Sequence, residues 1–163
     1  MCFLVKDILE QNLFPGARLA AGKAGLTAEI SWVNVMEILD SPDTVQPGEL
    51  LVTTGFGLDD SHRFGDLIAH LKARGVGGLA IQLYYLDHIP AYILESAERY
   101  GFAVLEFPKQ LTFSEILHVL FRRLNAGAPE NSLSDEMHRA ALSFFGRTLT
   151  AERTEKTLWF HLC

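Results

Sequence analysis

The sequence PGELLVTTGFG, residues 47–57, decides the fold that we expect for this chain. Its apolar run, Leu50 to Val52, leads into two threonines and a pair of glycines, a pattern typical of a buried strand that ends in an open loop. Such a strand delivers polar side chains and backbone amides to the rim of a sheet. We therefore expect any binding site of this chain to lie at this loop.

The segments that follow alternate regularly between helices and strands. Apolar periodicity and glycine caps predict helices over 61–74 and 90–100 and strands over 78–82 and 103–107. The capping box Thr112-Phe113-Ser114-Glu115 predicts one more helix, ending near residue 124. Because these strands are apolar on both faces, the predicted fold class is α/β, a mainly parallel sheet with helices on both faces, built from three strand-helix units.

Other elements are expected on either side of these units. A short helix near Val5, a weak strand over 17–22 and a strand over 30–37 predict a small mixed β portion. Residues 126–132, AGAPENS, are a linker candidate, and the apolar stripe that follows predicts a helical extension over 133–163. The predicted organisation is thus a domain over 1–125, a linker and the extension. Whether the extension packs back on the domain or dimerises with a second chain is open.

Composition and charge exclude several classes of protein. The chain has 163 residues, of which 48% are hydrophobic and 21% charged, as expected for one folded, water-soluble domain. The net charge of −6 hides no basic face, so we expect no direct contact with DNA or RNA. The N-terminus has no features of a signal peptide, and no apolar run approaches the roughly 18 to 20 residues that span a bilayer. We therefore expect a cytoplasmic protein without membrane contact.

The candidate ligand-binding residues follow from the direction of the predicted strands. In open parallel sheets, ligands bind beyond the carboxyl ends of the strands, where loops and helix N-termini meet. The candidates at or near such ends are Glu37, Glu49, Thr53, Thr54, Gly55, Phe56, Gln82, Tyr85 and Lys109. Two interpretations of the threonine-glycine loop are open. It is either a ligand-binding loop or a plain strand-to-helix turn, in which threonine acts as a capping residue and glycine supplies a positive φ.

Motifs for catalysis, metals and nucleotides are missing from the sequence. It contains no GxGxxG, GxxxxGK[ST], GxSxG or HExxH, and its six histidines show no i, i+4 pair. Neither Cys2 nor Cys163 lies in a nucleophile setting. We expect no catalytic residues, no metal and no cofactor. An enzyme that holds a phosphate-containing substrate on the threonine-glycine amides stays as the least favoured alternative.

Several short motifs, in a fixed order, resemble one known family. They are Val5-x-Asp7-x-Leu9, Gly16-Ala17-Arg18, Ser31-Trp32-Val33-Asn34-Val35-x-Glu37, Pro47 to Gly55, Gly78-Leu79-Ala80-Ile81, Asp87-x-Ile89-Pro90, Leu105-x-Phe107-Pro108 and Phe113-Ser114-Glu115-Ile116. Over roughly residues 3–125 the chain resembles the N-terminal domain of the PucR-like family of bacterial transcriptional regulators. Asn34, Thr44 and Tyr84 depart from the pattern of that family, and they stand near the expected rim.

The resemblance implies a function and partners. It implies a regulatory domain that senses a small-molecule effector in a regulator of purine or nitrogen catabolism, and a homodimer. It also implies that DNA is bound only through a C-terminal helix-turn-helix, which we do not find in these 163 residues. The alternative from a different class is a pure oligomerisation module whose loops are structural.

Overall fold

A five-stranded sheet forms the centre of the computed structural model, which describes residues 2–37, 39 and 44–125. Its strand order is β2-β7-β6-β5-β4. The strands are β4 (Trp32–Val35), β5 (Glu49–Thr53), β6 (Gly78–Gln82) and β7 (Val104–Phe107), which are parallel, and β2 (Arg18–Ala21), which is antiparallel to β7. The predicted mainly parallel sheet is confirmed, and the weak strand over 17–22 becomes its antiparallel edge.

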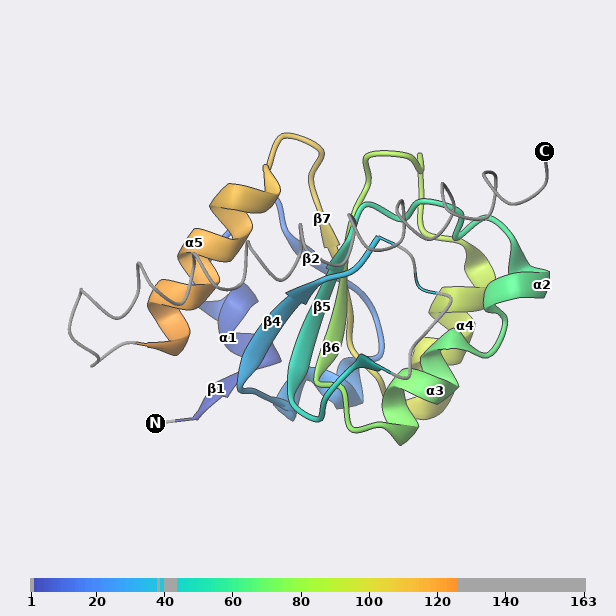
Figure 1. Ribbon diagram of the computed structural model, residues 1–163, viewed down its shortest axis with the longest axis horizontal. Helices are drawn as coiled ribbons and strands as arrows, with labels where there is room; N and C mark the ends of the chain where they lie inside the picture. The colour runs from blue at the N-terminus through green and yellow to red at the C-terminus, as the bar shows by residue number, and fades with distance from the viewer. Residues whose placement is uncertain (1, 38, 40–43, 126–163) are drawn as a thin grey trace, which may run out of the picture. The chain divides into compact units, whose positions relative to one another are not determined.

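Helices cover both faces of this sheet, as the sequence predicts (Figure 1). One face carries α2 (Ser61–Phe64), α3 (Leu67–Ala73) and α4 (Ala91–Tyr100), and the other carries α1 (Val5–Glu10) and α5 (Phe113–Leu124). The single helix predicted over 61–74 is wrong, because the chain breaks it at Gly65 and Asp66. Glycine and aspartate are both poor helix formers, and Asp66 leaves the helical region with ψ near 4°.

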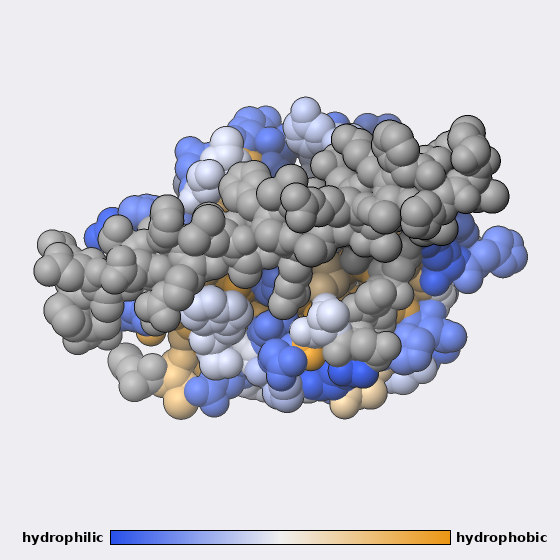
Figure 2. All heavy atoms as spheres, in the orientation of Figure 1, coloured by the Kyte–Doolittle hydropathy of each residue, from blue (hydrophilic) through white to orange (hydrophobic). Residues whose placement is uncertain are grey.

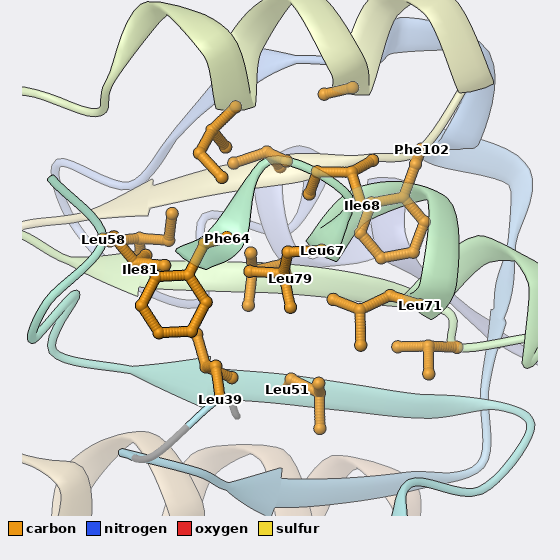
Figure 3. Packing of buried hydrophobic residues seen from close by; sticks show 14 of the residues in the cluster. Leu39, Leu51, Leu58, Phe64, Leu67, Ile68, Leu71, Leu79, Ile81 and Phe102 are labelled. Carbon is orange, nitrogen blue, oxygen red and sulfur yellow. The ribbon is translucent and has the colours of Figure 1, made fainter. Parts of the chain in front are cut away.

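The core is divided by the sheet into two layers. Leu50 and Val52 point toward α1 and α5, whereas Leu51, Leu79 and Ile81 point toward α2, α3 and α4 (Figure 3). All five side chains are 0% exposed. Side chains of alternate strand residues lie on opposite faces, so a strand buried on both faces must be apolar throughout. This is the physical reason for the apolar run in PGELLVTTGFG.

The small mixed β portion lies at the start of the chain. β1 (Phe3–Leu4) pairs antiparallel with β3 (Glu29–Ile30), and η1 (Lys23–Thr27) is a short 3-10 helix between β2 and β3. The strand predicted over 30–37 is therefore shared between β3 and β4. Gly22, with a φ of 76°, makes the turn into η1 so close to the main chain that a Cβ there would lie 1.8 Å from the Phe102 carbonyl oxygen.

By its contacts the chain divides after Leu124 into two units, and this description concerns the first. The predicted linker over 126–132 and the helical extension over 133–163 lie outside the described residues. Within the described part, the helices are too short or too polar to cross a membrane. Hydrophilic residues gather over α2 and α3, at the right of the view in Figure 2, as expected for the solvent side of surface helices.

Candidate functional site

The carboxyl ends of the parallel strands lie along one edge of the sheet, at the top of Figure 1. The ends of β4, β5, β6 and β7 at this edge, together with the loops that leave them, carry all the predicted ligand residues except Glu49. We call this edge the rim. The sequence alone left open whether these residues converge, and the parallel strands bring them to one edge.

Glu49 lies at the opposite edge. It is the first residue of β5 and Thr53 is the last, so the two are about 13 Å apart at ~3.3 Å per residue. The Glu49 carboxylate is buried and accepts a hydrogen bond from Asn34 Nδ2 at 3.2 Å. The direction of the strand separates Glu49 from the rim, so it does not join the other candidates.

Glu37 and Thr54 form a hydrogen-bonded pair that fastens the loop after β5 to the end of β4. Thr54 N donates to Glu37 Oε1 at 3.0 Å, and the Thr54 hydroxyl donates to Glu37 Oε2. Thr54 is 9% exposed, and Glu37 is half-buried. Hydrogen bonds to a charged group are stronger than those between neutral groups, so this pair holds two neighbouring loops in one arrangement.

Thr53 and Gly55 fix the conformation of the same loop. Thr53 Oγ1 accepts a hydrogen bond from Gly55 N at 3.2 Å. Gly55 has a φ of 79°, and a Cβ there would lie 2.7 Å from Leu86 Cδ1. The glycine thus permits both the left-handed turn and the close approach of Leu86 from the loop after β6.

Gln82 fastens the end of β6 to the loop after β7 by hydrogen bonds. Its Nε2 donates to the carbonyl oxygens of Lys109, at 3.3 Å, and of Leu111. The side chain is 5% exposed. Among the described residues, the buried polar and charged side chains are Glu49, Thr53, Thr54 and Gln82, and each has a partner inside the protein. Three of the predicted polar residues, Thr53, Thr54 and Gln82, thus support the rim through contacts inside the protein.

A tyrosine on α4 adds to this support. Tyr92 donates a hydrogen bond from its hydroxyl to the carbonyl oxygen of Leu58, at 2.7 Å, and so ties α4 to the loop after β5. Burial, with smaller contributions from Asp60 and Asp59, raises the pKa of Tyr92 to about 12. The hydroxyl therefore stays protonated and donating at neutral pH.

Three aromatic side chains of the rim are exposed. Phe56, from the loop after β5, contacts Tyr85 at 5.4 Å between ring centroids, and Tyr84 contacts Tyr85 at 5.0 Å, both edge to face. The three rings are 59%, 60% and 59% exposed in the order Phe56, Tyr85, Tyr84. We call them the aromatic cluster. The sequence predicted Phe56 and Tyr85 as site residues but not Tyr84, although the Tyr-Tyr pair, one residue beyond the predicted strand over 78–82, was the available signal.

Charge at the rim is mixed. The Lys109 ammonium lies 3.9 Å from an Asp87 carboxylate oxygen, and both side chains are exposed, at 52% and 97%. An ion pair at this distance and exposure is weak, so Lys109 can exchange Asp87 for an anionic group of a ligand at small cost.

A hollow lies beside α2 and α3 and was not predicted. It is lined by the buried Phe64 and Leu67 and by exposed polar side chains, which include His62, Asp66 and His70. This is a mixed set of charges on two short helices. The hollow depends on the break of the helix at Gly65, which the apolar periodicity of this segment conceals.

The arrangement at the rim favours binding over catalysis. Its exposed groups include the three aromatic rings and the Lys109–Asp87 ion pair, which can pack against a ligand and pair with its charge. Within the part that the structure describes, no three His, Cys, Asp or Glu side chains are grouped to hold a metal ion.

Comparison with known proteins gives two consistent matches. Residues 7–124 match the family described as the purine catabolism regulatory protein-like family. The purine catabolism regulatory protein of Bacillus subtilis (strain 168) is 37% identical over 128 residues, which cover 74% of this chain and 24% of that protein. The chain thus spans about a quarter of the length of this relative.

Proposed function

The chain belongs to the purine catabolism regulatory protein-like family, and we propose that it is the small-molecule-sensing part of a bacterial transcriptional regulator of purine or nitrogen catabolism. The effector binds at the rim. DNA is contacted by another part of the regulator, through a helix-turn-helix, because the net charge of −6 and the lack of a cluster of basic residues in this sequence do not favour binding to the phosphates of DNA. The regulator acts in the cytoplasm, as a homodimer and without catalysis.

One observation carries the proposal for the rim: three large aromatic side chains stay about 60% exposed on loops that internal hydrogen bonds hold in place. Exposed aromatic groups on well-ordered loops are typical of binding surfaces, since a rigid platform loses little entropy when a ligand binds. Two roles follow for the predicted residues. Phe56, Tyr85 and Lys109 contact the effector, whereas the other rim residues hold the loops, namely Glu37, Thr53, Thr54, Gly55 and Gln82.

A thermal-shift screen of ureides, purines and amino acids tests the sensing function. We expect at least one compound to raise the melting temperature of the full chain in proportion to its concentration. Tyr85→Ala and Lys109→Ala should reduce this ligand-dependent shift while leaving the melting temperature without ligand nearly unchanged. Thr54→Val should do the reverse, lowering the melting temperature of the free protein and weakening the ligand effect only indirectly.

Tyr100→Ala is the matched control. Tyr100 is 42% exposed at the end of α4, away from the rim loops, so its removal should leave the ligand shift unchanged. A compound whose effect survives Tyr85→Ala and Lys109→Ala but is lost in His70→Ala would contradict the rim and favour the hollow. If no compound stabilises the chain, the alternative of a pure oligomerisation module is favoured.

A further inference from the structure

The hollow beside α2 and α3 is large enough to hold a small molecule, and the function proposed for the rim does not use it. Its volume is about 720 Å³, which lies within the roughly 300–1,000 Å³ of ordinary ligand pockets. Its floor belongs to the apolar layer shown in Figure 3, where Phe64, Leu67 and Leu39 are 5%, 4% and 2% exposed. The floor therefore offers apolar atoms to the body of a ligand.

The walls of the hollow carry nitrogen donors. His62 and Arg63 come from α2, whereas His70 lies on α3 and Arg74 directly follows it, and all four side chains are exposed. Among the described residues that line the hollow, Asp66 is the one carboxylate. In a chain with a net charge of −6, the hollow is thus a local excess of groups that bind anions.

Helix geometry directs these side chains to one place. His70 and Arg74 are four residues apart, so they lie on the same face at the end of α3. Ala73 also lines this face, and its small side chain leaves the space open. Lys72 is two residues from each of them, roughly 200° around the helix, and its ammonium donates to Gly101 O at 3.3 Å, outside the hollow.

We propose that the hollow binds a small organic anion, whose carboxylate, sulfonate or phosphate group contacts the histidine and arginine side chains and whose apolar body lies on the floor. The guanidinium of Arg63 lies 5.3 Å from the ring centroid of Phe64, so a wall cation and a floor ring already stand together. Arg63 and Arg74 also interact elsewhere in the protein, but a guanidinium has five N–H donors and can serve an internal acceptor and a ligand together. The hollow is a second small-molecule site, in addition to the effector site at the rim.

Fluorescence titration of the full chain with anilinonaphthalene sulfonate tests the site. This probe joins an apolar body to a sulfonate, and phenylnaphthylamine is the same body without the charge. We expect saturable binding of the sulfonate, about tenfold tighter than binding of the neutral probe. Arg63→Met and Arg74→Met should each weaken it about two- to fivefold, and the double variant about tenfold. Lys72→Met is the matched control, because it removes the same charge from the same helix outside the hollow.

Ala73→Glu tests the hollow without removing an arginine, so it decides the matter if an arginine variant is poorly folded. Ala73 is exposed, and glutamate is a good helix former that places a carboxylate among the lining groups. This variant should keep the circular dichroism spectrum and lose binding of the sulfonate probe. Equal losses for Arg74→Met and Lys72→Met would overturn the proposal, as would the absence of saturable binding. Binding that Tyr85→Ala abolishes and Ala73→Glu leaves unchanged would place the probe on the aromatic cluster and also overturn it.

Discussion

Thr54→Val isolates the hydrogen bond that joins the loops after β4 and β5. Valine keeps the shape of threonine and the Thr54 N–H bond to Glu37 Oε1, but it removes the hydroxyl that donates to Oε2. Thr54 is 9% exposed, and Glu37 is half-buried. A hydrogen bond to a charged group contributes about 1.5–3 kcal/mol, and the partial access of Glu37 to water lowers the expected loss to about 1–2 kcal/mol.

The measurement is thermal and urea unfolding of the free full chain. For a domain of this size, a loss of about 1–2 kcal/mol lowers the melting temperature by roughly 3–8 °C. Thr27→Val is the matched control: Thr27 is exposed at the end of η1, so its loss should change stability by less than about 0.5 kcal/mol. A double-mutant cycle with Glu37→Gln should show a coupling energy of about 1 kcal/mol. Equal melting temperatures for Thr54→Val and Thr27→Val would refute the reasoning.

Three further predictions concern other contacts. Tyr92→Phe should cost about 1 kcal/mol at neutral pH because the Leu58 carbonyl loses its donor, and urea unfolding at several pH values should show this cost shrinking between pH 10 and 12. The direction of this pH dependence follows from the pKa of Tyr92, which is raised to about 12 from the ordinary 10. The contribution of the Tyr92 hydroxyl to stability is therefore complete below pH 10 and is lost as the pH rises to 12. Gly22→Ala should lower the yield of folded protein or cost more than about 3 kcal/mol, since a Cβ would meet the Phe102 carbonyl; an unchanged melting temperature would contradict this packing. Hydrogen bonds from the N-cap residue lower the pKa of Glu115, so stability should fall as the pH drops below about 4.5, and less steeply in Glu115→Gln.

Much of the fold was predictable because its signals are local. Apolar periodicity gave the order of strands and helices, and the Thr112 capping box is present, with Thr112 and Glu115 joined by hydrogen bonds of 2.8 to 3.2 Å. The break at Gly65 was also a local signal that periodicity hid, because Phe64, Leu67 and Ile68 fit one continuous helix in spacing alone.

The sequence could indicate which residues stand at the strand ends, but not the contacts that they make with one another. The direction of the parallel strands places the rim at their carboxyl ends. Because Glu49 is the first residue of β5, the same direction places it at the opposite edge. The pairing of Glu37 with Thr54 depends on the register of β4 against β5, in which Val35 lies beside Val52. The register between these two strands cannot be derived from a single amino-acid sequence. The burial of Gln82 depends in the same way on where the loop after β7 passes.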